Sequence, residues 1–295
     1  MSRCFYLYSE YYVPLDDLQE MAQLSIDKKY TIGLKKFESE DFFAGTFYIE
    51  GDAARGVHVI IEEGQITVKI DILSNEADFV MAIIILDLLS YVLEKEVYDE
   101  RGTVIVAREY FSDEKIQEFR ENDAKYALMS FKANPEENFQ MIGVVRNIYF
   151  GESLRYVLEK YEDNPEKLVD VFDRINEHVQ YGLPEYKNPE ATYICNGDYG
   201  YTEKPLIIRT MLKGNSYILQ DYDYLMIPSN KEIIFIDNND LLEIAYELFD
   251  DNSGFEIADD FTVVFPKLKG KMWNSFIELA REKNHRELLS ALLYT

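Results

Sequence analysis

The sequence predicts an α+β fold with two mostly antiparallel sheets, each covered by helices. Its strand-like segments occur in runs and do not alternate with helices, which disfavours a parallel sheet. Two of these segments, 57–62 and 66–72, alternate apolar and polar residues and are joined by Glu63-Gly64, a pair suited to a hairpin turn. The apolar segment 79–93 places its few polar residues on one stripe of a helix, so a buried helix explains it better than a membrane span.

The individual elements follow from turn and capping residues. Before residue 134 we predict strands at 3–8, 30–37, 46–50, 57–62, 66–72 and 103–107, and helices at 14–25, 79–93 and 112–131. Pro14 opens the first helix, Ser74 or Asn75 caps the second, and Ser112 caps the third. From 134 to 185 we predict a strand at 139–145 and helices at 152–161 and 164–182. Beyond residue 185 we predict strands at 191–195, 205–211, 217–227, 232–236 and 261–265, and helices at 241–249, capped by Asn238, and 271–281.

The length of 295 residues predicts two domains, since one domain usually takes about 100–200 residues. We place an N-terminal α+β domain at 1–133, a mostly helical connector at 134–185 and a C-terminal α+β domain at 186–295. Asn134-Pro135 ends a helix, and the polar stretch 183–189 carries two prolines. Both domains run several strands, a helix, a strand rich in Thr and Val, and a helix. This order is explained either by an internal duplication or by chance recurrence of a common pattern.

The formal net charge of −25 decides which partners the sequence favours. A charge of this size repels phosphate backbones and anionic membranes, so we expect no nucleic-acid and no membrane partner. Segment 79–93 is about five residues short of the ~20 that a spanning helix needs, and it contains Asp87. The first residues have no apolar signal segment, which favours a cytoplasmic location. The oligomeric state is not predicted.

Residues with catalytic or metal-binding chemistry show no characteristic spacing. Cys4 and Cys195 lie far apart, and His58, His178 and His285 have no Cys or His companion at the spacing of a zinc site. Nucleophile and phosphate-loop motifs are incomplete. In the helix 164–182, a spacing of four residues relates Asp170, Arg174 and His178, and likewise Asp173 and Glu177, which is typical of a solvated ion-pair ladder. We therefore predict no catalytic residues, no metal and no cofactor.

One candidate site is basic. Lys267, Lys269 and Lys271 lead into a predicted helix that contains Trp273. Backbone N–H groups at a helix start, together with ammonium groups, can bind an anion. Alternatively, lysines at the end of a strand protect a sheet edge from aggregation.

The other candidate site is rich in tyrosine. The chain has 23 tyrosines, concentrated in 4–13, 193–201 and 217–224, where Asp and Glu separate them. Tyrosine combines a large contact area with a polar tip, so such a surface suits a basic protein partner. The candidate binding residues are Asp198, Tyr199, Tyr201, Tyr222 and Tyr224. Alternatively, tyrosines in 217–224 are half-buried residues of a sheet.

The passage 66–107 runs from a strand through Ser74 and the apolar helix to Glu100-Arg101-Gly102 and a further strand. In this passage, and in its length and acidity, the chain resembles the uncharacterised bacterial families of domains of unknown function. In general character it is also similar to cytosolic immunity proteins, which neutralise toxins by presenting acidic, aromatic surfaces. Neither resemblance carries over a site residue.

These observations lead to three functional hypotheses. The first is a non-enzymatic binding protein of a bacterial cytoplasm, with an acidic, tyrosine-rich surface for a protein partner, for which a basic protein is the candidate. The alternative is an enzyme or small-ligand binder whose acidic residues, Asp198, Glu203, Asp237 and Asp240, converge only in the fold. The third is a structural role through self-assembly.

Overall fold

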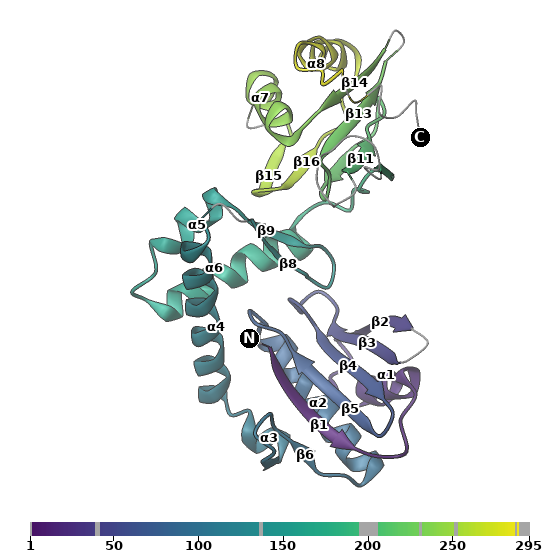
Figure 1. Ribbon diagram of the computed structural model, residues 1–295, viewed down its shortest axis with the longest axis vertical. Helices are drawn as coiled ribbons and strands as arrows, with labels where there is room; N and C mark the ends of the chain where they lie inside the picture. The colour runs from purple at the N-terminus through teal and green to yellow at the C-terminus, as the bar shows by residue number, and fades with distance from the viewer. Residues whose placement is uncertain are drawn as a thin grey trace. The chain divides into compact units, whose positions relative to one another are not determined.

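A computed structural model describes residues 2–38, 42–135, 138–194, 206–229, 232–250, 253–286 and 288 (Figure 1). Contacts along the chain divide it into two compact units, Met1–Gly182 and Leu183–Thr295, called here the N-terminal and the C-terminal unit. The domain bounds 1–133, 134–185 and 186–295 stay predictions of the sequence. Among the described residues, no helix combines the length and apolar character that crossing a bilayer requires.

The N-terminal unit is built on a seven-stranded sheet with the order β2-β3-β4-β5-β1-β6-β7, in which all neighbours are antiparallel. Its strands are β1 (Arg3–Tyr8), β2 (Ile32–Glu38), β3 (Phe43–Ile49), β4 (Val57–Glu62), β5 (Gln65–Ile70), β6 (Val97–Tyr98) and β7 (Val104–Ile105). The alternation that predicted the β4–β5 hairpin buries Val57, Val59 and Ile61 of β4 opposite Ile66, Val68 and Ile70 of β5. The predicted hairpin is confirmed.

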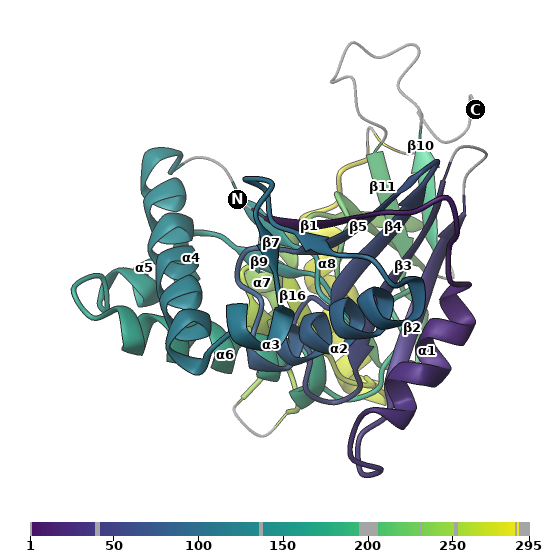
Figure 2. The ribbon, with the colours of Figure 1, turned by 90° about the horizontal axis from the view of Figure 1, so that it is seen from below.

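Two helices, α1 (Leu15–Leu24) and α2 (Glu76–Leu93), pack on one face of this sheet (Figure 2). Asn75 caps α2, and its side chain and that of Asp78 form a capping box. Phe79, Ile85 and Leu89 of α2 are completely buried in the core beneath the strands. The apolar segment of the sequence is therefore a core helix.

The rest of the N-terminal unit is mostly helical. It comprises α3 (Ala107–Tyr110), α4 (Asp113–Ala133), β8 (Phe139–Met141), β9 (Ile148–Phe150), α5 (Glu152–Glu159), α6 (Pro165–Glu177) and the π-helical turn η1 (His178–Gly182). The guanidinium of Arg3 donates to both carboxylate oxygens of Asp123, at 2.8 and 2.7 Å, and so joins β1 to α4. Helix α6 packs along α4.

The C-terminal unit contains a four-stranded sheet, β10-β11-β13-β14, and a three-stranded sheet, β12-β16-β15. The bounds are β10 (Ala191–Ile194), β11 (Leu206–Thr210), β12 (Tyr217–Leu219), β13 (Tyr224–Pro228), β14 (Ile233–Ile236), α7 (Asn238–Leu248), β15 (Glu256–Asp259), β16 (Thr262–Phe265) and α8 (Gly270–Glu282). One core joins both sheets to the two helices. The α+β class with mostly antiparallel sheets is confirmed.

Several sequence expectations are wrong in detail. The predicted strand 217–227 is two strands in different sheets, because the chain leaves the extended conformation at Asp221, whose φ is 52°. Asp237, and not Asn238, caps α7. Strand β15 was not predicted, and the strand expected at 139–145 ends at Met141.

The strand orders also contradict the internal duplication. The N-terminal unit has one antiparallel sheet of seven strands, whereas the C-terminal unit divides its strands between two sheets. In addition, β11 and β13 pair in parallel. A duplicated unit would keep one strand order, so the similar sequence of elements is a chance recurrence.

Candidate functional site

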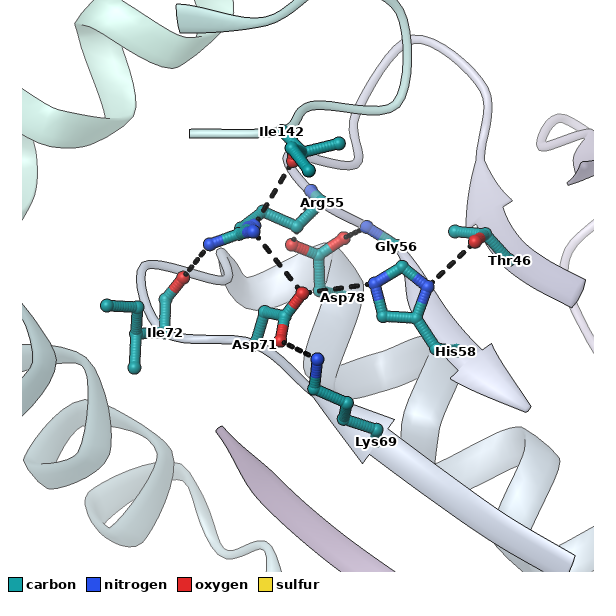
Figure 3. A network of polar contacts seen from close by, with 9 residues as sticks. All are labelled: Thr46, Arg55, Gly56, His58, Lys69, Asp71, Ile72, Asp78 and Ile142. Carbon is teal, nitrogen blue, oxygen red and sulfur yellow. Dashed lines mark hydrogen bonds and ion pairs between the residues drawn. The ribbon is translucent and has the colours of Figure 1, made fainter. Parts of the chain in front are cut away.

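A network of polar contacts fixes the loop that precedes β4 against the start of α2 (Figure 3). Asp78 is completely buried, and its carboxylate accepts hydrogen bonds from the backbone N–H groups of Arg55 at 3.1 Å, Gly56 at 2.8 Å and Asn75 at 3.0 Å. Burial raises the pKa of the Asp78 carboxyl, and the three N–H groups act in the opposite direction. The loop is therefore held by one side chain.

Asp71 is the second anion of this network. It accepts hydrogen bonds and ion pairs from Arg55 at 3.2 Å, Lys69 at 2.8 Å and His58 at 3.1 Å. Burial acts to raise the pKa of Asp71, but the hydrogen bond from His58 and the charge of Arg55 outweigh it and hold the pKa far below its usual range. Arg55 also donates to the carbonyl groups of Ile72 and Ile142, at 2.9 and 3.2 Å (Figure 3).

Thr46, His58 and Asp71 form a line of hydroxyl, imidazole and carboxylate. The Oγ1 of Thr46 lies 2.8 Å from Nδ1 of His58, whose Nε2 lies 3.1 Å from Asp71. The residue types are those of nucleophilic catalysis. However, Thr46 is only 5% exposed and Asp71 is shared with two cations, so the line serves the stability of the network.

The loop and helix start that this network holds form one wall of a pocket of about 540 Å³ in the N-terminal unit. Asn75 donates to the carbonyl of Asp52 at 2.6 Å, and the hydroxyl of Tyr181 donates to that of Ala53 at 2.7 Å. Burial, followed by the negative charges of Asp78 and Asp52, raises the pKa of Tyr181, so its hydroxyl stays a donor. Helices α4 and α6 provide the opposite wall.

The pocket has an apolar floor and an acidic rim. Its buried apolar lining residues are Ile49, Phe111 and Ile116, and its acidic lining residues are Asp52, Glu76, Asp113, Asp173 and Glu177. Arg120 is the one basic residue of the lining, and its guanidinium is paired with Asp173. The other four acidic side chains have no ion-pair partner within the described part of the chain. Glu76 and Asp113 also stabilise the first turns of α2 and α4, and the charges of all four acids are available to a cation.

Asn176 of α6 is the buried polar residue of this pocket. It is 5% exposed, and its Oδ1 has no hydrogen-bond partner among the described residues. A buried acceptor without a partner destabilises a fold by about 1–3 kcal/mol. Such an unpaired group beside a pocket of ligand size is typical of a position that a ligand completes.

Comparison with known proteins assigns this part of the chain to a family. Residues 2–186, well over half of the chain, match the family model described as a domain of unknown function, DUF4299. The chain belongs to the DUF4299 family. The sequence resemblance to an uncharacterised domain family is thereby confirmed. No curated protein and no solved structure gives a significant match. All residues that line the acidic pocket lie within the DUF4299 segment, so we call it the DUF4299 pocket below.

The tyrosine-rich candidates lie outside the DUF4299 segment. Asp198, Tyr199 and Tyr201 fall outside the described residues. The hydroxyl of Tyr222 donates to Oδ1 of Asn238 at 2.7 Å, and burial, followed by the charge of Asp237, raises its pKa. The ring of Tyr224 packs edge-on against His285, with centroids 5.2 Å apart.

The structure brings together two of the acids named in the alternative hypothesis. Asp237 and Asp240 form the capping box of α7, and Nε2 of His285 lies 2.8 Å from Asp240 and 3.9 Å from Asp237. One ligand atom from each lies within 4.8 Å of the others, which is compatible with a metal ion. Lys283, 3.9 Å from Asp240, competes for the same negative charge. Glu203 is outside the described residues. Helix capping and an ion pair account for this cluster.

The residues of the basic candidate site differ in burial: the three lysines are exposed, whereas Trp273 is buried. Lys267, Lys269 and Lys271 are exposed, and Lys269 is the N-cap residue of α8 without a side-chain capping bond. Trp273 is only 7% exposed and packs against Phe276 in the core of the C-terminal unit. Binding of an anion at this helix start stays a prediction.

The sequence did not identify the DUF4299 pocket. The spacing of Asp173 and Glu177 is typical of a solvated ladder, and Asp52, Glu76 and Asp113 lie in loops or at helix starts, where acids are common. The available signal was Asn176, a residue type of low helix propensity within an otherwise apolar and charged helix, but its burial is evident only in the fold.

Proposed function

We propose that this chain is a non-enzymatic binding protein and that its DUF4299 pocket holds a positively charged side chain of a basic protein partner. The observation that carries the proposal is the acidic rim above an apolar floor, with the single lining cation already neutralised by Asp173. Complementary charge accelerates encounter and selects among partners, and apolar contact then slows release. In a bacterial cytoplasm, the location we propose, the free thiol of Cys4 stays reduced.

An exposed group of aromatic residues in the same unit supports a protein partner. Tyr11 and Tyr12 are 77% and 59% exposed, and the ring of Tyr12 stacks on that of Phe43, which is 50% exposed. Tyr and Phe are enriched at the centres of protein interfaces, because they bury a large area at a low entropic cost. Tyr11 and Tyr12 belong to the tyrosine-rich segment 4–13 of the sequence, and Phe43 is the first residue of β3.

Neutralising two rim acids tests the proposal. In Glu76→Gln/Asp113→Asn, we expect affinity for a short basic peptide to fall about tenfold, because each lost carboxylate weakens the attraction of a cation. The affinity of the wild type should also fall steeply as salt is raised from about 0.05 to 0.5 M. Isothermal titration calorimetry with the full chain measures both effects.

The matched control is Glu62→Gln/Glu63→Gln, which removes the same charge from the exposed β4–β5 turn outside the pocket lining. This variant should bind the peptide almost as the wild type does. An equal loss in both double variants would show that only the overall charge matters, and it would contradict the pocket as the binding site.

A further inference from the structure

Asn176 supplies a buried acceptor to the pocket lining. Its Oδ1 is buried and has no hydrogen-bond partner among the described residues. An amide whose oxygen has no partner can rotate about χ2 and exchange the positions of its oxygen and its nitrogen. A ligand can therefore bind the Asn176 amide in either orientation, including the one in which Oδ1 faces the pocket.

From this geometry we infer that the pocket selects arginine, with Oδ1 of Asn176 accepting a guanidinium N–H and the rim acids balancing its charge. The inference rests on the proposed function and names the side chain that the partner supplies. It requires three features in one place: a buried acceptor, an apolar surface and unpaired carboxylates. Asn176, Phe111 and Glu76 respectively provide them in the lining of this pocket.

Arginine fits these three features better than lysine does. A guanidinium has five N–H donors in one plane, so it can donate to an amide oxygen and to a carboxylate at the same time. It is weakly hydrated and stacks on aromatic and apolar surfaces, whereas an ammonium is a strongly hydrated point charge. A buried neutral acceptor above an apolar floor therefore favours the group that gives up its water more easily.

The pocket already contains one guanidinium, which is paired with a carboxylate. Arg120 projects from α4 into the lining and pairs with Asp173 of α6, so one carboxylate of the rim is occupied from within the chain. Asp52, Glu76, Asp113 and Glu177 have no ion-pair partner among the described residues, and these four remain for a second guanidinium. The net charge of the lining stays negative when Arg120 is included.

Three peptides of equal sequence, with arginine, lysine or the uncharged citrulline at one position, test the inference by titration into the full chain. For the wild type, we expect the arginine peptide to bind about tenfold more tightly than the lysine peptide. Citrulline should bind most weakly, because it lacks the charge. In Asn176→Leu, the arginine peptide should lose about tenfold in affinity and its advantage over lysine should disappear.

Two controls keep the outcome interpretable. Asn122→Leu removes an exposed amide of α4 outside the pocket lining and should leave the preference intact. Asn176→Leu should also melt at a higher temperature than the wild type, because it removes an unpaired buried acceptor. If Asn176→Leu does not fold, Asn176→Ser, which shortens the side chain, is titrated instead and should show the same loss of preference.

The experiment distinguishes failure of the arginine assignment from failure of the proposed function. Equal binding of the arginine and lysine peptides to the wild type, or a preference that survives Asn176→Leu, overturns the arginine assignment and leaves the basic partner in place. Failure of both peptides to bind overturns the proposed function itself. A single blocked arginine that binds as tightly as the peptide supports the guanidinium site but contradicts a protein partner.

Discussion

Replacing Asp78 with alanine is expected to lower the free energy of unfolding by about 4 kcal/mol, because one buried and two partly buried backbone N–H groups lose their shared acceptor. The backbone groups of Arg55, Gly56 and Asn75 cannot turn toward water, since the loop and the helix start are packed against the core. Asp78→Asn should also be destabilised, because its amide nitrogen would face N–H groups that need an acceptor. Urea denaturation followed by circular dichroism measures the change.

Asp17→Ala is the control for this prediction. Asp17 is an exposed acid in the first turn of α1, so its replacement should leave the free energy of unfolding nearly unchanged. A loss of stability in Asp78→Ala that is no larger than in Asp17→Ala would show that the buried carboxylate does not hold the loop.

Asp71→Asn is expected to lower the free energy of unfolding by about 3 kcal/mol at pH 7, because Arg55 would stay buried without its counter-ion. The side chains of Arg55 and Asp71 are only 12% and 13% exposed, so water replaces little of the lost charge. Asp16→Asn breaks an ion pair with Lys36 in which both side chains are well exposed, and it should change stability far less.

The effect of Asp71 should depend on pH in a defined direction. The network lowers the pKa of Asp71 in the folded state, so its stabilising contribution is present above its unfolded pKa of about 4 and is lost as the pH falls toward the folded pKa. The stability difference between the wild type and Asp71→Asn should therefore be full at pH 7 and narrow below about pH 4. Denaturation curves at several pH values test this, and a difference that is constant with pH would contradict it.

The sequence predicts elements well where local pattern and burial agree. Alternation identified β4 and β5, and Asn75 was one of two residues expected to cap α2. Segment 217–227 contains Asp221, a residue type that tolerates a positive φ, but its local pattern does not show that the chain passes to another sheet there. The end of the strand at Asp221 therefore depends on tertiary packing and not on the local sequence pattern.

The candidate site was less predictable for a related reason. Acids at helix starts and on helix faces look the same whether they face open water or surround a pocket, and the pocket joins residues from Ile26 to Tyr181. Asp78 could be recognised as a capping residue, but its contacts with Arg55 and Gly56 connect positions more than twenty residues apart. These contacts depend on the fold.

The long span of the pocket along the chain has a consequence for work with fragments. A fragment ending at Ala133, the last residue of the predicted N-terminal domain, would keep the sheet, α2 and the whole of α4. It would lack Asn176 and Tyr181, and with them one side of the pocket and the bond to Ala53. Such a truncated protein could retain its core and still be unable to recognise a ligand, so binding assays should use a chain that extends through Gly182 at least.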